Sequence, residues 1–325
     1  MIDSVKQADT VIEYSYEEAL DILKDEIDKI LSASPKIIRE YTMHLGKSFG
    51  KLMRAKSILI CAENKQGFVL SNAVILANAI ELLHLATLVH DDVIDKSDMR
   101  RGKVTLQKKY GNRIAVICGD YLLSVALKMV AAVSDKEKYL DKKIPDFVGN
   151  ICLGELRQQI NNGNYNLSVF QYLRIISGKT ACMFKTAFYA GASLVEEDET
   201  KIRKYAKIGH YLGMIFQLTD DCMDFETTET IAKKPVQSDY EKDVITLPLI
   251  HTFKVFENVR EKAKIHILTR SEINKLVKKS GGLLYTRKLA RKYYKKAIML
   301  IQELEITEQK RERIVSLLDN AYRVF

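Results

Sequence analysis

Apolar residues recur every three or four positions over most of the chain, which is the pattern of amphipathic helices. Leu, Ala, Lys and Glu, which favour helices, are frequent in these segments, and only four prolines interrupt them. We therefore predict an all-α fold. The expected helices, some of them broken in two, cover 17–64, 68–98, 113–133, 144–162, 168–192, 198–226, 246–261, 271–279 and 283–320.

Two polar segments separate helical patterns without dividing the chain. Residues 135–143 read as a solvated connection, and the polar stretch 225–245, which contains Pro235, is the longest expected loop and a candidate lid. There is no repeat and no Gly/Ser-rich or Pro-rich linker. With 325 residues, 47% of them hydrophobic, we expect one domain over 1–325 with a large buried core.

The most apolar run, residues 68–89, contains Asn72, Asn78, Glu81 and His84 and is therefore expected to be a buried core helix rather than a membrane span. The N-terminus lacks the basic and apolar regions of a signal peptide. The five scattered cysteines form no Cys-x-x-Cys pair. These features predict a cytoplasmic protein. Its net charge of +9 favours anionic partners, although charge alone is weak evidence.

The stretch HDDVIDKSDMRRG, residues 90–102, concentrates charge of both signs. On a helix, Asp91 and Asp95 lie one turn apart on a face that continues back through His84 to Glu81. Unpaired carboxylates would be costly in the interior, and Mg²⁺ commonly bridges such groups to a phosphate. The alternative is an acidic helix end in water with arginines as surface partners.

A second acidic motif, FQLTDDCMDF at 216–225, repeats the pattern as Asp220, Asp221 and Asp224. In a helical bundle two such motifs can face each other across a central cavity. Several divalent ions there would imply a highly charged ligand such as diphosphate. Three basic clusters suit that ligand: Lys51 with Arg54, Arg100 with Arg101, and Lys179 with Thr180.

Several ordered motifs of the chain resemble those of the trans-type polyprenyl diphosphate synthases, and among these the bacterial heptaprenyl diphosphate synthase catalytic chains. They are FGKLMRA, ELLHLATLVHDDVIDKSDMRRGKVTL, CLGELRQQ, SGKTA, FQLTDDCMDF and KKPVQSDYEKDVITLPL. The resemblance is strong from about residue 45 to 250 and looser toward the C-terminus. It implies the isoprenoid synthase fold, a single-domain helical bundle around a central cavity.

The resemblance also assigns roles to residues. Isopentenyl diphosphate is expected at Lys51, Arg54, His84 and Arg101, and the allylic diphosphate at Arg100, Lys179, Thr180, Gln217 and Lys234. Three Mg²⁺ ions per active site are expected on Asp91, Asp95 and Asp220. The catalytic residues would be Asp91, Asp92, Asp95, Lys179, Asp220, Asp221 and Asp224.

The implied activity is condensation of an allylic diphosphate with isopentenyl diphosphate. The small residues Thr87 and Ala86, four and five positions before Asp91, argue against an early stop to chain growth. We therefore expect a medium- or long-chain all-trans product, geranylgeranyl or longer, with Ser124, Val125 and Lys128 as deeper walls.

The family usually has GKRxRP where this chain reads Gly50-Lys51-Leu52-Met53-Arg54-Ala55, and GKP where it reads Lys233-Lys234-Pro235. Because the GKxxR core is present, we expect isopentenyl diphosphate binding to survive these changes.

Three other functions fit part of the pattern: a terpene cyclase of the same fold, a metal-dependent phosphohydrolase suggested by His90-Asp91, and a non-catalytic regulatory subunit of a heteromeric synthase. The expected partners are the two diphosphates and no nucleic acid. We expect a homodimer, or a heteromer with a small subunit, and transient membrane association for a lipid product.

Overall fold

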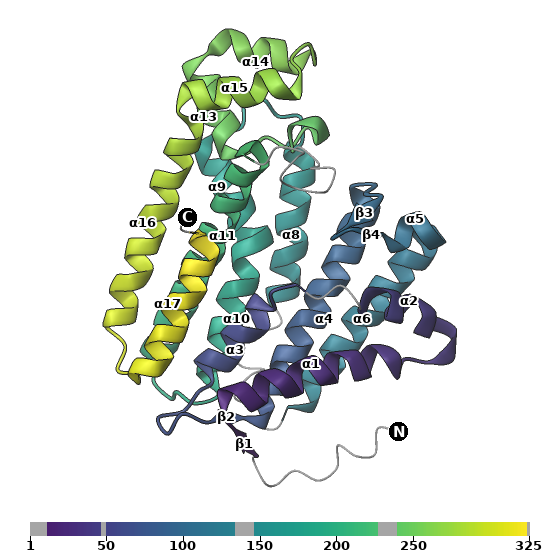
Figure 1. Cartoon of the computed structure of the whole chain (residues 1–325), viewed down its shortest axis with the longest axis vertical. Helices are drawn as coiled ribbons and strands as arrows, with labels where there is room; N and C mark the ends of the chain where they lie inside the picture. The colour runs from purple at the N-terminus through teal and green to yellow at the C-terminus, as the bar shows by residue number, and fades with distance from the viewer. Residues whose placement is uncertain (1–11, 47–49, 134–145, 227–238, 324–325) are drawn as a thin grey trace. The chain divides into compact units, whose positions relative to one another are not determined.

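The computed structural model describes residues 12–46, 50–133, 146–226 and 239–323, and it confirms the all-α prediction (Figure 1). The helices are α1 Tyr16–Ser32, α2 Lys36–Gly46, α3 Met53–Cys61, α4 Ser71–Ile94, α5 Leu106–Tyr110, α6 Asn112–Ala132, α8 Asp146–Asn161, α9 Val169–Ile176, α10 Cys182–Ser193, α11 Glu199–Glu226, α13 Leu247–Val255, α14 Glu257–Lys264, α15 Arg270–Ser280, α16 Gly282–Gln302 and α17 Glu308–Tyr322. A π-helical segment, η2, covers Ser177–Ala181, and a 3₁₀ turn, η3, covers Tyr240–Lys242.

Two short antiparallel strand pairs accompany the helices in the described part of the chain. Strand β1 (Glu13–Tyr14) pairs with β2 (Val69–Leu70), and β3 (Met99–Arg100) pairs with β4 (Lys103–Val104). Neither pair was predicted from the sequence: residues 69–70 were expected to be helical, and residues 96–104 carry no alternating apolar pattern.

The segment expected as one helix over 17–64 is three helices, α1 to α3. Pro35, which has no backbone N–H and disfavours a helical residue before it, separates α1 from α2. Before α3, Leu52 has a positive φ of 51° and ends any continuous helical path. The helix pattern was thus right in type and wrong in length.

The chain forms two compact units. The first contains 1–142, 187–205 and 306–313, and the second contains 143–186, 206–305 and 314–325. The unit boundaries fall within α10, α11 and α17, so these helices contribute residues to both. The expectation of a single domain over the whole chain stays a prediction.

In the first unit, α4 and α6 pack side by side (Figure 1). Gly119 on α6 makes room for His90 on α4, because a Cβ at Gly119 would lie 2.3 Å from the His90 Nε2 atom. Both helices are long and apolar enough to cross a membrane by length and composition alone. The apolar window of α4 is 61% buried, as expected of a core helix, whereas that of α6 is only 28% buried.

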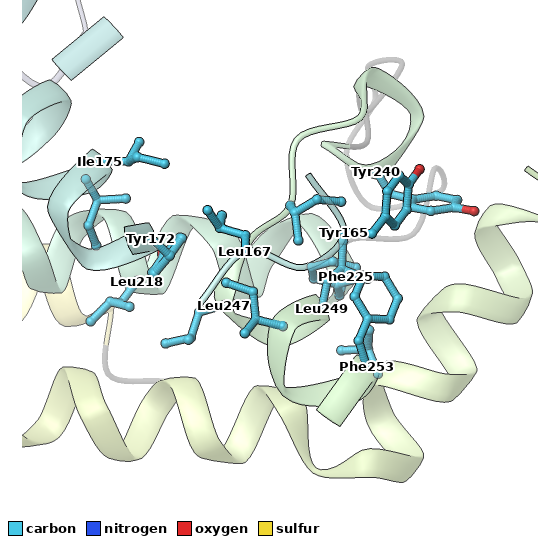
Figure 2. Close-up of a cluster of buried hydrophobic side chains, with 14 of the residues drawn as sticks. Tyr165, Leu167, Tyr172, Ile175, Leu218, Phe225, Tyr240, Leu247, Leu249 and Phe253 are labelled. Carbon is cyan, nitrogen blue, oxygen red and sulfur yellow. The ribbon is translucent and has the colours of Figure 1, made fainter. Parts of the chain in front are cut away.

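In the second unit, a core of buried side chains joins α9, α11, η3 and α13 (Figure 2). The Tyr165 ring lies 5.9 Å from that of Phe253, and its hydroxyl donates a 2.8 Å hydrogen bond to Asp243 Oδ1. These contacts fasten the segment that starts at residue 239 to the connection between α8 and α9. The same core contains Phe225, the last residue of the second acidic motif.

Candidate active site

The first acidic motif lies at the C-terminal end of α4. Asp91 is half-buried, and Asp95 is an exposed C-cap residue whose N–H donates to the Asp91 carbonyl at 2.8 Å. Asp92 is buried, and its Oδ1 accepts a 2.7 Å hydrogen bond from Arg100 Nε. The predicted pair, Asp91 and Asp95, is therefore kept on one face, while Asp92 positions an arginine.

The β3–β4 hairpin presents the two arginines that follow this motif. Arg101 and Gly102 form its two-residue loop, with φ angles of 49° and 77°. Positive φ at both positions is the signature of a type I′ turn, for which glycine at the second position is well suited. The Arg101 guanidinium lies against Gly50, where a Cβ would come within 2.8 Å of Nη2.

Glu81 on α4 caps the N-terminus of α3. Its carboxylate accepts hydrogen bonds from the N–H of Ala55, at 3.0 Å, and from that of Arg54. The N-cap residue Leu52 provides no side-chain acceptor for these N–H groups. This contact between α3 and α4 fixes the start of α3. It also places Arg54 near the Glu81 carboxylate, which favours the charged guanidinium.

Positive charge accumulates around Arg54. Burial lowers the pKa of Arg54 to about 10; Glu81 opposes the shift and Arg101 adds to it. Burial, then Arg54, Arg101 and Arg100, hold the pKa of His84 well below its ordinary value, so this imidazole is neutral at pH 7. Within the described residues its buried Nδ1 has no hydrogen-bond partner. An excess of mutually repelling cations beside an unsatisfied polar atom is typical of an anion site.

His90 does not take part in this cluster. Its Nε2 lies 3.3 Å from the Val116 carbonyl oxygen and 3.3 Å from Asp120 Oδ1, both on α6. The His90 imidazole is therefore engaged with α6.

The second acidic motif lies at the end of α11, in the second unit. Asp221 is buried, and both of its carboxylate oxygens are engaged: Oδ2 accepts from the Tyr172 hydroxyl, and Oδ1 accepts from Gln217 Nε2 at 2.8 Å. The Thr180 hydroxyl in turn donates to Gln217 Oε1 at 2.7 Å. Burial raises the pKa of Asp221 to about 7. Thr180 and Gln217, expected as substrate contacts, thus also position Asp221.

Lys179 lies in the π-helical segment η2. Its Nζ is 2.6 Å from Glu155 Oε2 on α8. This approach depends on two glycines, since a Cβ at Gly154 would come within 2.4 Å of the Lys179 backbone nitrogen and within 3.0 Å of the Gly178 Cα. Glu155 was not singled out from the sequence, although it lies in the motif CLGELRQQ.

Two further residues of the second unit join this site. The Asp239 N–H donates to Asp224 Oδ2 at 3.1 Å, and burial, followed by the nearby aspartates, raises the pKa of the Asp239 carboxyl well above its ordinary value. Arg323 Nη2 lies 3.4 Å from Asp220 Oδ1, and its guanidinium lies 5.6 Å from the centre of the Phe216 ring. Asp239 stood within a quoted motif, whereas no sequence signal indicated Arg323.

The remaining expected residues are Lys51, which is exposed beside Gly50, and Lys234, which lies outside the described residues. No group of three metal-ligating side chains occurs in the described ranges. A metal bound by the aspartates would therefore need oxygens from a ligand or from water. That the two motifs face each other stays a prediction.

The motifs around both sites match a known family over most of the chain. The sequence pattern of the family described as polyprenyl synthetase matches residues 35–280. The chain belongs to the polyprenyl synthetase family. The resemblance inferred from the motifs is therefore confirmed.

Relatives within the family are similar over nearly their full lengths. Heptaprenyl diphosphate synthase component 2 of Geobacillus stearothermophilus is 30% identical, over 91% of this chain and 93% of the relative. The octaprenyl diphosphate synthase of Escherichia coli is 31% identical, over 88% of this chain and 90% of the relative. Relatives of this kind are trans-prenyl diphosphate synthases, and the chain is accordingly an enzyme, a prenyltransferase.

Solved structures show the same fold. The crystal structure of heptaprenyl diphosphate synthase from Staphylococcus aureus has a TM-score of 0.87 and 31% identity, over 96% of this chain and 99% of that chain. A polyprenyl synthase from Caulobacter crescentus, complexed with calcium and isoprenyl diphosphate, has a TM-score of 0.85 and 28% identity over 95% of each chain. The isoprenoid synthase fold expected from the sequence is confirmed.

Proposed function

We propose that the enzyme condenses an allylic diphosphate with isopentenyl diphosphate in an Mg²⁺-dependent reaction. The product would be an all-trans polyprenyl diphosphate of geranylgeranyl length or longer. The two substrates would bind at separate basic clusters, one around Arg54 and one around Lys179.

The observation that carries this proposal is the cluster of Arg54, His84 and Arg101. Burial lowers the pKa of Arg54 and of Arg101, Arg101 adds to the shift of Arg54, and Glu81 opposes the shift of both arginines. A diphosphate would relieve this repulsion, and arginine forks match its oxygens. Neutral His84 adds a hydrogen-bonding group without adding another positive charge. We assign this cluster, with Lys51, to isopentenyl diphosphate.

Mg²⁺ fits the acidic residues by their donor chemistry. Asp91, Asp95 and Asp220 offer carboxylate oxygens, without the sulfur or imidazole ligands that favour zinc. The Caulobacter crescentus relative, crystallised with calcium and isoprenyl diphosphate, supports a divalent cation bound together with a diphosphate. We propose three ions per site. When bound, they would neutralise charge that develops on the departing diphosphate.

The residues of the chain would act by binding and positioning. Lys179 and Arg100 would stabilise the negative charge on the allylic diphosphate as its carbon–oxygen bond breaks. The isopentenyl double bond, held near the resulting carbocation, would form the new carbon–carbon bond, and loss of one proton would complete the cycle. The released diphosphate is the proposed proton acceptor, and no protein nucleophile is required.

A long product is consistent with the small residues on α4. Ala86 is buried and adds little bulk, and the Thr87 hydroxyl donates to the His84 carbonyl of its own helix at 2.8 Å. Neither residue carries an aromatic ring that would block a growing chain. The names of the heptaprenyl and octaprenyl relatives support the same proposal.

A second subunit is part of the proposal. Helix α6 exposes Val116, Ile117 and Leu127, with 39%, 59% and 51% of their surfaces accessible, and an apolar helix face of this kind favours burial against another chain. The partner would be a second copy or a small subunit, since relatives are named component 2 of a synthase. A cytoplasmic location also belongs to the proposal.

The test is incubation of the purified chain alone with Mg²⁺, labelled isopentenyl diphosphate and farnesyl diphosphate, followed by chromatography of the dephosphorylated products. The proposal requires a ladder that ends in one long prenyl alcohol. A cyclic hydrocarbon would identify a cyclase instead. If no label is incorporated with any primer, even after a small subunit is added, the chain is not the catalytic subunit.

A further inference from the structure

The positive charge of the chain is concentrated in one segment. Residues 254–302 contain fourteen lysines and arginines and three acidic residues, whereas the whole chain contains 51 and 42. The other 276 residues, with 37 basic and 39 acidic side chains, are slightly acidic. The net charge of +9 is therefore a property of the region from the end of α13 through α16, and not of the molecule as a whole.

Helix α16 has two contrasting sides. Its packed side is fastened within the second unit: Gly282 closely approaches the Pro248 carbonyl, and the Tyr293 ring lies 5.6 Å from that of Tyr211. Ala290, Ala297 and Ile301 are buried on this side. The helix contains six lysines and arginines and no acidic residue. Every charged side chain on α16 is thus positive.

The exposed side carries five of these cations, which we call the basic face: Lys288, Arg291, Lys292, Lys295 and Lys296. The sixth, Arg287, is paired with Glu226 at 2.7 Å. Within the described chain, none of the five residues of the basic face belongs to an ion pair. Neighbouring cations on a helix repel one another. In an ordinary solvated helix, acidic residues three or four positions from each cation offset this repulsion. This face lacks that compensation.

Exposed apolar side chains lie in the same row as the lysines. Leu284, Lys288, Lys292, Lys295 and Met299 follow one another at spacings of three or four residues and so share one side of the helix. Leu284 and Met299 are 58% and 61% exposed. At a lipid surface, exposed apolar side chains can enter the acyl boundary while neighbouring lysines keep their ammonium groups at the phosphates.

We propose that the basic face of α16, with Leu284 and Met299, binds the surface of an anionic membrane. Its charge complements the phosphates of anionic lipids, and its fixed position within the unit presents the five cations together. The choice of a membrane over nucleic acid or an acidic protein rests on the proposed function, because a long prenyl product is insoluble in water. The exposed Leu284 and Met299 favour the same choice.

The test is cosedimentation of the full chain, without substrates, with vesicles of phosphatidylcholine containing about one third phosphatidylglycerol. We expect binding that weakens as salt is raised, and no binding to phosphatidylcholine alone. The triple variant Lys288→Gln, Lys292→Gln, Lys295→Gln should bind on the order of a hundredfold more weakly. The matched control Lys36→Gln, Lys65→Gln, Lys207→Gln removes three exposed lysines elsewhere and should bind almost normally.

A second variant separates a lipid surface from other polyanions. Leu284→Ala with Met299→Ala should weaken vesicle binding severalfold and leave binding to a single-stranded oligonucleotide unchanged. The proposal is overturned if the chain ignores anionic vesicles, if it prefers the oligonucleotide, or if both lysine triples lose affinity equally. Prenyl transfer in detergent solution is measured in parallel. Inactivity of every form there would count against the proposed function, whereas the vesicle result stands independently.

Discussion

The Tyr172 hydroxyl on α9 donates a hydrogen bond to the Asp221 carboxylate on α11, and both side chains are buried. Together with Gln217, this contact engages both oxygens of Asp221. Asp221 is therefore held within the protein, whereas its neighbour Asp220 has a side chain that is 53% exposed. The three aspartates of the second motif have different surroundings, which the spacing alone did not reveal.

Replacing Tyr172 with Phe removes one of these hydrogen bonds. The bond lowers the pKa of Asp221 from the value that burial alone would impose, so its loss should raise that pKa above about 7. We expect the acid limb of the pH profile of kcat to move to higher pH and the unfolding free energy to fall by ~1 to 3 kcal/mol. Tyr165→Phe removes a similar bond, to Asp243, and should leave the pH profile in place.

Arg323 supplies a positive charge at Asp220 through a contact of 3.4 Å. If Asp220 is a metal ligand, Arg323→Ala should strengthen binding of Mn²⁺ to the substrate-free protein, by at most about fivefold because exposed pairs contribute ~1 kcal/mol or less. Electron paramagnetic resonance measures this directly. Arg311→Ala, which removes a contact to Glu308 in the same helix, is the control. Weaker Mn²⁺ binding in Arg323→Ala would contradict the view that Arg323 competes with the metal for Asp220.

His84 should make stability fall as the pH is lowered. Its folded pKa lies well below 6.5, so below pH 6.5 the unfolded chain binds a proton that the folded chain does not. This group then contributes a loss of ~1.4 kcal/mol per pH unit until its folded pKa is reached. Urea unfolding of the wild type and His84→Gln at pH 7.5, 6.5 and 5.5 isolates the effect. If the unfolding free energies of the two proteins change equally with pH, a neutral, buried His84 is excluded.

Ala86 should control the length of the product. Ala86→Phe places a ring on α4 one turn before the first acidic motif, so we expect the main product to become shorter without loss of the first condensation. Chromatography of the dephosphorylated alcohols gives the chain length, and Ala86→Val provides a smaller step. An unchanged product distribution in Ala86→Phe would remove Ala86 from the path of the growing chain.

Much of the fold followed from the sequence because helical periodicity and charge spacing are local properties. Both acidic motifs lie at helix ends as expected, and Asp91 and Asp95 share a face. Helix breaks were harder to place, because Leu52 ends a helical path through its backbone angle and not through a residue type that breaks helices.

The contacts that complete the site depend on residues far apart in sequence. Glu81 caps a helix 26 residues earlier, and Arg323 meets Asp220 across 103 residues. No periodic pattern encodes such pairs. Glu155 and Asp239 lie inside the motifs CLGELRQQ and KKPVQSDYEKDVITLPL. Their contacts with Lys179 on η2 and Asp224 on α11 are seen only in the structure.

The most direct test of the account is the equilibrium binding of isopentenyl diphosphate by isothermal titration calorimetry. We assign this substrate to the cluster of Arg54, His84 and Arg101. Arg54→Gln should therefore weaken its binding by at least tenfold, because a charge-assisted contact to phosphate is lost, whereas Lys179→Gln should change it little. If Arg54→Gln binds isopentenyl diphosphate as tightly as the wild type, or if Lys179→Gln is the variant that loses it, the assignment of the two basic clusters is wrong.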